Sequence, residues 1–294
     1  MAERDYAPVP DIPGSTGFIP GTGVELIRRV RPVRPPEHAL FDFDGTLSLV
    51  REGWMDIMVP MMSGILDEYR RPGETAKAVE ILVREFVTRL TGKQTIYQMM
   101  HLADEIRSRG GEPSDPQEYK ERYHSLLMER IAGRRAALAD GSAQAEAYLV
   151  PGSVALLEAL LDRGVAIYIA SGTDEAYVLE EAELLGLTRY APGRIHGAQR
   201  DIAAFSKEMV IRRILDTNKV EGARLLAFGD GYVEIADSKA VGGYAVGVAT
   251  DETNRSGKPD AWKRQRLIGA GADVIIPDYA DASALLDWIW SGRT

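Results

Sequence analysis

Short hydrophobic runs recur along the chain, and a turn signal borders each of them. The runs lie at residues 39–43 (ALFDF), 165–170 (VAIYIA), 224–228 (RLLAF), 244–249 (YAVGVA) and 273–276 (DVII). Brief apolar runs bounded by turn-forming residues are typical of strands that are buried on both faces. These five runs predict a parallel sheet.

Apolar residues at helical spacing fill the intervals between the runs. One helix face carries Val154, Leu157, Leu160 and Leu161 before Gly164, and another carries Val210, Ile214 and Leu215 after Lys207. Buried strands that alternate with amphipathic helices indicate an α/β fold with a Rossmann-like parallel sheet at its core.

The pattern changes between residues 50 and 150, where no strand-like run occurs. Apolar residues there keep helical spacing, at Val79, Leu82, Phe86 and Leu90 and again at Ile96, Met99, Met100, Ala103 and Ile106. We therefore expect an α/β core domain of residues 38–49 and 151–294, interrupted by an all-helical cap domain of residues 50–150. Residues 1–37, rich in Pro and Gly, are expected to form an extension that wraps the core or is partly loose.

Composition excludes several classes of protein. With 294 residues, 45% hydrophobic and 27% charged, the chain is long and apolar enough to fold. Its net charge of −9 disfavours nucleic acid and anionic membranes as partners. It has no cysteine, which excludes thiolate chemistry and fits a reducing compartment. Because no apolar run approaches the roughly 20 residues of a membrane span, we expect a cytoplasmic protein.

Two carboxylates follow the first predicted strand. Asp42 and Asp44 are two residues apart and precede Gly45 and Thr46. Residues at this spacing face the same side of a strand, so both acids can point into one site. Open parallel sheets bind ligands at this edge, outside the carboxyl ends of the strands. The alternative is that Asp and Gly serve only as turn formers here.

Further polar residues follow the next strands. Ser171, Gly172 and Thr173 come after the second run and offer a hydroxyl and backbone N–H groups to an anion. Other candidates are Lys207, which opens a predicted helix, Asp230, which follows the third run, and Glu234. Each has a purely structural alternative: a serine can cap a helix, a lysine can be solvated, and a glutamate can favour a helix N-terminus.

The motifs DFDGT, SGT, SK and GDGYVE, in this order and with a helical insertion between the first two, resemble the haloacid dehalogenase superfamily. The resemblance covers residues 39–278 and is to the phosphoglycolate phosphatase and β-phosphoglucomutase-like group, which has a helical cap. It implies that Asp42 is a nucleophile that forms an aspartyl-phosphate. It implies that Asp44 protonates the leaving oxygen and then deprotonates water. Relatives that cleave carbon–halogen or carbon–phosphorus bonds lack an acid at that position.

The resemblance also assigns a metal. Mg²⁺ would be held by Asp42, the backbone carbonyl of Asp44, and Asp230. Glu234 stands where relatives often have Asp, so it would reach the metal through water, and Asp237 is the alternative.

Phosphate and substrate contacts are expected from both parts of the chain. Ser171 and Gly172 would bind phosphoryl oxygens, Lys207 would neutralise their charge, and Thr46 is grouped with the substrate-binding residues. Arg51, Trp54 and Lys93 are the candidate contacts from the cap, which would close over the site. Met55, Met58, Met61 and Met62 are expected in the core of the cap, with a role in lining the site as the alternative.

These roles predict a Mg²⁺-dependent phosphomonoesterase that acts on a small phosphorylated metabolite, of the sugar phosphate or phosphoglycolate type. A phosphomutase of the same family and a non-catalytic protein that binds a phosphorylated metabolite remain as alternatives. The N-terminal extension also leaves open a docking role toward a partner or a second copy of the chain.

Overall fold

The computed structural model describes residues 16–291 and is built on an eight-stranded sheet with the order β1-β2-β8-β7-β6-β3-β4-β5. The strands are β1 (Gly17–Phe18), β2 (Glu25–Leu26), β3 (His38–Phe41), β4 (Ala166–Asp174), β5 (Ile195–Ala198), β6 (Leu225–Gly229), β7 (Tyr244–Val248) and β8 (Val274–Ile276). From β8 to β5 all neighbours are parallel, whereas β1 and β2 add an antiparallel edge. The expected α/β fold class is confirmed.

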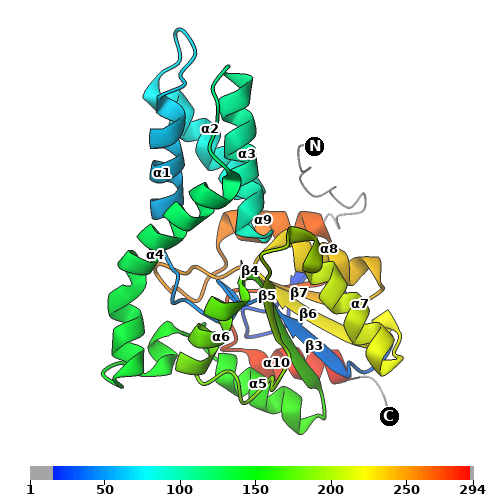
Figure 1. Cartoon of the computed structure of the whole chain (residues 1–294). Helices are drawn as coiled ribbons and strands as arrows, with labels where there is room; N and C mark the ends of the chain where they lie inside the picture. Colours follow the sequence, from blue (N-terminus) through cyan, green and yellow to red (C-terminus); the bar gives the residue numbers. More distant parts are fainter. Residues whose placement is uncertain (1–15, 292–294) are drawn as a thin grey trace.

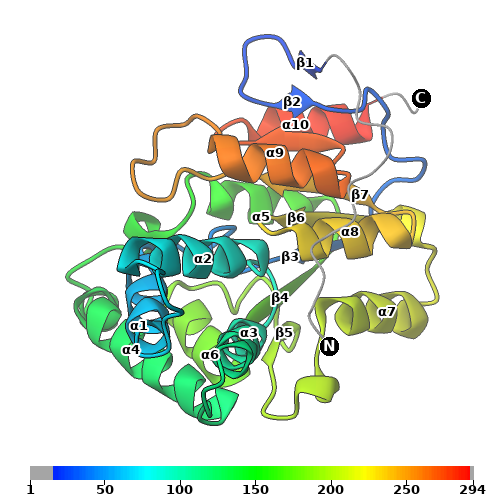
Figure 2. The same cartoon turned by 90° about the horizontal axis from the view of Figure 1, so that it is seen from above.

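Helices cover both faces of the sheet, which makes three layers (Figure 2). They are α5 (Ser153–Asp162), α6 (Glu175–Leu184), α7 (Lys207–Asn218), α8 (Tyr232–Ala240), α9 (Ala261–Ala270) and α10 (Ala282–Trp290). Contacts of α8 with α7 and α9 place these three together on one face, and α10 contacts α5 on the other. At the centre of the sheet Phe41 and Phe228 stack with their ring centroids 4.5 Å apart.

Four helices between β3 and α5 project beyond one edge of the sheet (Figure 1). These cap helices are α1 (Met55–Asp67), α2 (Ala76–Arg89), α3 (Thr95–Ser108) and α4 (Pro116–Ala139). The side chain of Thr75 accepts the amide of Ala78 and so caps α2, and Asp115 does the same for Gln117 of α4. Helix α1 contacts the other three, and its buried residues include Met58, Met61 and Met62.

The five predicted strands are all present, but the prediction was incomplete. It missed β5, whose sequence IHGA has no apolar run, and the two-residue strands β1 and β2, which are too short to show a period. Strand β4 also continues to Asp174, so Ser171, Gly172 and Thr173 lie inside its last part and not beyond it. Its pairing with β5 is irregular between Ala170 and Asp174.

The part of the N-terminal extension that the structure describes is paired with the sheet. Residues 17–26 supply β1 and β2, and β2 pairs with β8. This segment therefore lies against the core, which is one of the two arrangements expected for the extension. Pro8, Pro10 and Pro13 lie outside the described residues. Within residues 16–291, each helix is too short or too polar to cross a lipid bilayer.

An ion pair between a buried glutamate and a partly exposed arginine fixes this edge. Glu25 of β2 receives hydrogen bonds of 2.6 Å from both Nε and Nη2 of Arg264 on α9, and the Thr16 hydroxyl donates to it at 2.6 Å. Burial raises the pKa of Glu25, but the bonds from Arg264 and Thr16 outweigh that effect and leave the pKa below its ordinary value. The carboxylate is therefore charged in a place that water hardly reaches.

We expect Arg264→Ala to lower the free energy of unfolding by about 2 kcal/mol, because it leaves the Glu25 carboxylate buried without its partner. The loss should be measured by urea denaturation. Arg107→Ala is the control, since Arg107 pairs with Asp104 where both side chains are more than half exposed, and about 0.5 kcal/mol or less is expected. Equal losses in the two variants would contradict this account.

Candidate active site

A tight loop after β3 sets the two aspartates in place. The amide of Asp42 donates to the Phe228 carbonyl at 2.9 Å and so continues the ladder between β3 and β6. The amides of residues 46–48 then all donate to the Phe43 carbonyl, and Gly45 adopts a left-handed φ of 74°. A Cβ at Gly45 would lie 2.3 Å from the Asp230 carboxylate, so the position requires glycine on both grounds.

Asp42 is buried against a lysine. The Lys207 Nζ lies 2.8 Å from Oδ1 of Asp42 and 2.8 Å from Oε2 of Glu234. Burial raises the pKa of Asp42 well above its ordinary value, the Lys207 ammonium counters this, and the Glu234 and Asp230 carboxylates add to it. The Asp42 and Glu234 carboxylates in turn raise the pKa of Lys207 against the effect of its own burial. Lys207 is thus charged and holds the Asp42 side chain at the sheet edge.

Three carboxylates converge at this edge. Asp42, Asp230 and Glu234 each offer an oxygen, and these atoms lie within 4.8 Å of one another. An all-oxygen set of this kind fits a hard divalent cation such as Mg²⁺. Glu234 is the least available of the three, because its Oε1 accepts the Gly231 amide at 2.8 Å and its Oε2 accepts Lys207. The structure thus places Glu234 in the cluster chiefly as the second partner of Lys207.

Asp44 lies on the other side of Asp42 and is surrounded by hydroxyls. Its Oδ2 accepts hydrogen bonds from Ser171 at 3.2 Å and Thr173 at 2.9 Å, and Arg51 Nε lies 3.7 Å from its Oδ1. Burial raises the pKa of Asp44, Arg51 counters the rise, and Glu181 adds to it. A carboxyl group with a raised pKa can carry a proton at the moment when a leaving group needs one.

Arg51 is committed to a partner in the core domain. Its Nε lies 3.1 and 3.0 Å from the two carboxylate oxygens of Glu181 on α6, and its Nη2 donates at 2.8 Å. Both side chains are buried, and such a bidentate pair is geometrically fixed. Arg51 therefore lines the site from a fixed position.

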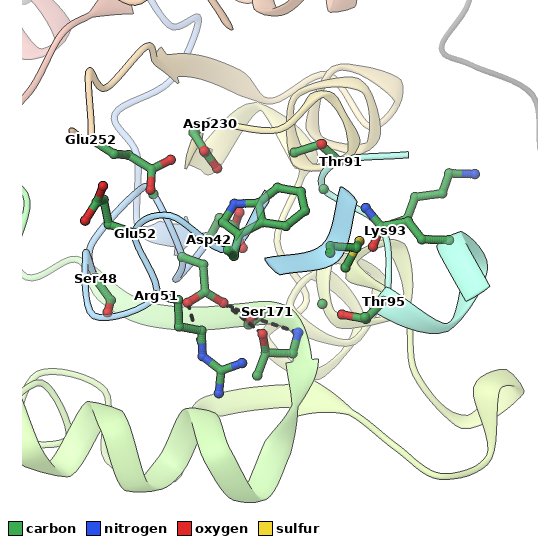
Figure 3. A pocket seen from close by; sticks show the side chains of 18 of the residues that line it. Asp42, Ser48, Arg51, Glu52, Thr91, Lys93, Thr95, Ser171, Asp230 and Glu252 are labelled. Atoms are coloured by element: carbon green, nitrogen blue, oxygen red, sulfur yellow. Dashed lines mark hydrogen bonds and ion pairs between the residues drawn. The ribbon is translucent and has the colours of Figure 1, made fainter. Parts of the chain in front are cut away.

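One cavity of about 730 Å³, its open mouth included, joins these groups (Figure 3). It is lined by Asp42, Asp44, Gly45, Ser48, Arg51, Glu52, Trp54, Met58, Thr91, Gly92, Lys93, Thr95, Gln98, Tyr123, Ser171, Gly172, Thr173, Lys207, Asp230 and Glu252. The three expected cap contacts, Arg51, Trp54 and Lys93, are among them. Met58 is both buried in the cap core and part of the lining.

Thr46 is the exception among the expected substrate contacts. It is fully buried, it is not part of the cavity wall, and its hydroxyl accepts the Asp230 amide at 3.0 Å. Thr46 therefore positions Asp230, and the grouping with substrate-binding residues was wrong. Adjacency to the first motif does not determine which way a side chain points.

The loop between α2 and α3 closes the cavity from the cap side. Its backbone packs on glycines of the core: a Cβ on Gly172 would lie 2.6 Å from the Lys93 carbonyl oxygen, and one on Gly92 would lie 3.2 Å from Gly231 Cα. Next along the chain, Gln94 donates from Nε2 to the Phe205 carbonyl at 2.7 Å. The cap is thus seated on the core through backbone contacts that leave no room for a methyl group at Gly172.

A second cavity lies behind this loop. Lys93, Glu208 and Asp237 are among its lining residues, and it shares Lys93 and Lys207 with the first. Asp237 belongs to this cavity and not to the carboxylate cluster, so the structure favours Glu234 over Asp237 as the acid near Lys207. Burial raises the pKa of Asp237 to about 6, with Glu208 and Glu234 adding to the rise and Lys207 and Lys93 opposing it.

The sequence matches the haloacid dehalogenase-like hydrolase family over residues 36–242. This span covers more than half of the chain and contains Asp42, Asp44, Ser171, Lys207 and Asp230. The chain belongs to the haloacid dehalogenase-like hydrolases. The sequence-based assignment to this superfamily is therefore confirmed. A comparison with curated proteins finds no significant match.

Solved structures share the fold of this hydrolase at low sequence identity. A hydrolase from Pseudomonas syringae has a TM-score of 0.55 and 20% identity, over 87% of this chain and 100% of the other. A predicted phosphoglycolate phosphatase from Haemophilus somnus has a TM-score of 0.54 and 17% identity, over 86% and 99%. A haloacid dehalogenase-like protein of unknown function from Agrobacterium tumefaciens has a TM-score of 0.54 and 19% identity, over 85% and 97%.

Several residues at or near the site were given no side-chain role from the sequence. Thr173 belongs to the SGT motif, and its alternation with Ser171 along β4 was a usable signal. Glu181, Glu252 and Lys263 have no such signal. They lie on α6, on the loop after β7 and on α9, where charged residues are ordinarily solvated.

Asp237 gives a stability prediction with a defined sign. Its pKa of about 6 in the folded state exceeds that of an ordinary aspartate, so its contribution to stability is lost as the pH rises from about 4 to about 6. We expect Asp237→Asn to gain about 1–2 kcal/mol over the wild type at pH 7.5 and little at pH 4.5, by urea denaturation. The exposed Asp216→Asn is the control and should show no such pH dependence. A gain of equal size at both pH values would contradict the assignment.

Proposed function

We propose that this hydrolase is a Mg²⁺-dependent phosphomonoesterase that acts on a small phosphorylated metabolite of the sugar phosphate or phosphoglycolate type. The supporting observation is the pairing of Asp42 and Asp44 in one cavity, with different surroundings. Asp42 contacts the Lys207 ammonium at 2.8 Å, which favours its charged form, whereas Asp44 accepts hydrogen bonds from the Ser171 and Thr173 hydroxyls. One group suits a nucleophile and the other an acid.

The reaction would proceed in two displacements. In the first, an Asp42 carboxylate oxygen forms a bond to phosphorus, the bond to the leaving oxygen breaks, and Asp44 gives that oxygen its proton. In the second, Asp44 takes a proton from water, whose oxygen attacks the phosphorus of the aspartyl-phosphate and frees Asp42. Inorganic phosphate and the dephosphorylated alcohol are the products.

Two sets of groups would bind the phosphoryl oxygens. Asp42, Asp230 and the backbone carbonyl of Asp44 would hold Mg²⁺, which supplies positive charge between the carboxylate and the phosphate. Lys207 and Ser171 border the same cavity, with the amide of Gly172 beside them as a further donor.

Substrate selection is assigned to the helical cap, residues 50–150. Trp54 and Lys93 line the cavity, and Gln94 fastens the cap loop to the core. Because cap residues form part of its wall, the cavity suits a small metabolite better than a folded phosphoprotein.

Phosphate release from a panel of phosphorylated metabolites tests the proposal. We expect release with Mg²⁺, none with EDTA, and at least a ~10³-fold loss of kcat in Asp42→Asn, because the amide is a poor nucleophile. Asp237→Asn is the matched control and should retain activity. Conversion of one phosphate isomer into another without net release would instead identify a phosphomutase. Binding of a phosphorylated compound without turnover would identify a binding protein.

Gly172 gives a second test, of the closed cap. In Gly172→Ala the new methyl group would meet the Lys93 carbonyl at 2.6 Å and push the cap loop away from the site. We expect a loss of about tenfold or more in kcat/KM, as for other small displacements of positioned groups. Gly64→Ala is the control, because Gly64 lies on α1 with no atom within 4 Å of its added Cβ. Unchanged kinetics in Gly172→Ala would show that cap seating does not matter to the reaction.

A further inference from the structure

Helix α9 brings into the active site a lysine that the mechanism above does not use. The Nζ of Lys263 lies 2.7 Å from Oδ2 of Asp230 and 2.7 Å from Oε1 of Glu252. The three side chains are 12, 8 and 17% exposed, so these contacts are shielded from water. Asp230 and Glu252 both line the cavity, and Figure 3 shows them on the same side of it.

This contact commits one oxygen of Asp230. Its Oδ2 accepts the ammonium at a short, charge-assisted distance, whereas its Oδ1 has only the Thr46 hydroxyl at 3.5 Å. Asp230 is one of the three carboxylates of the cluster that suits a cation. The carboxylate therefore has one free oxygen to offer and one that is already bound.

Lys263 is fixed at both ends. Its amide donates to the side chain of Asp260, which caps α9, and its ammonium is shared with Glu252. The next residue, Arg264, ties the same helix to Glu25 at the edge of the sheet. If the Lys263 ammonium moved out of this position, its buried contacts to the Asp230 and Glu252 carboxylates would be lost. The lysine is therefore a fixed component of the site.

The two common hard cations use carboxylates differently. Mg²⁺ is small and strictly octahedral and takes single oxygens, whereas Ca²⁺ accepts six to eight ligands and readily binds both oxygens of one carboxylate. We propose that Lys263 is a positioning residue that keeps Asp230 a one-oxygen ligand and so makes the site select Mg²⁺ over Ca²⁺. This inference rests on the metal dependence of the proposed function.

A purely electrostatic effect of Lys263 would change the affinity for both cations and leave their ratio unchanged. Removal of the ammonium makes the site more negative, which strengthens the binding of every divalent cation by a similar factor. The ratio of the Mg²⁺ and Ca²⁺ dissociation constants cancels that effect. The double variant Lys263→Met/Glu252→Gln removes one positive and one negative charge, so it frees Oδ2 of Asp230 without a change in the net charge of the site.

Isothermal titration of the whole protein with Mg²⁺ and with Ca²⁺, in the absence of substrate, tests the proposal. We expect the ratio of affinities to shift toward Ca²⁺ by about tenfold in Lys263→Met and in the double variant, which is about 1.4 kcal/mol. Lys239→Met is the matched control. Lys239 forms a comparable ion pair with Asp273, at 2.8 Å and away from the cavity, and its loss should leave the ratio unchanged.

The outcomes separate this inference from the function on which it rests. An unchanged ratio in the double variant, with Mg²⁺-dependent phosphate release intact in the wild type, overturns the role of Lys263 alone. A failure of the wild type to bind either cation overturns the metal dependence itself and this inference with it. Thermal denaturation checks that each variant is folded, since Asp230 loses its ammonium partner in both variants, whereas Glu252 is left as an unpaired charge only in Lys263→Met.

Discussion

The balance of buried charge at one edge of the sheet is the constraint on which the rest of the structure depends. Four carboxylates, those of Asp42, Asp230, Glu234 and Glu252, face two ammonium groups, those of Lys207 and Lys263. Carboxylates at this density repel one another and resist burial, so each must have a partner. Two ammonium groups do not balance four carboxylates. A cluster of this composition therefore suits further positive charge, such as that of a divalent cation.

The partners come from distant parts of the chain, and this ties the layers together. Lys207 begins α7, whereas Lys263 and Arg264 are neighbours on α9 that reach in different directions, to the active site and to the edge strand β2. Arg266, one turn further, donates to the Arg89 carbonyl at the end of cap helix α2 at 2.5 Å. One short helix therefore contacts Asp230 of the carboxylate cluster, the N-terminal segment and the cap. Lys263, Arg264 and Arg266 of this helix each bind a different part of the molecule, although their sequence is typical of a helix face exposed to solvent.

Local pattern was sufficient for the groups at the ends of strands, whereas groups on helices were predicted only where a family motif marks them, as at Lys207 and Glu234. Asp42, Ser171 and Asp230 could be brought together from the sequence because parallel strands present their carboxyl ends at the same edge. Nothing local distinguishes Lys263 or Glu181 from solvated charges, since their burial depends on how α9 and α6 pack on the sheet. Thr46 shows the converse error: it adjoins the first motif, but the tight turn points its hydroxyl toward the backbone of Asp230 and away from the cavity.

The connection between sheet and cap gives Asp44 a dependence on cap position. Residues 50–52 are bonded to the cap and to the core in turn. The carbonyls of Val50 and Glu52 accept hydrogen bonds from Arg134 of cap helix α4. The Arg51 side chain between them binds Glu181 of the core. The guanidinium of Arg51 also lies beside Asp44 and lowers its pKa against the effect of burial. Glu181 holds the Arg51 guanidinium to the core, so a displacement of α4 reaches Asp44 through the backbone on either side of Arg51. We therefore expect the cap to act on the acid through this short segment when a substrate is enclosed.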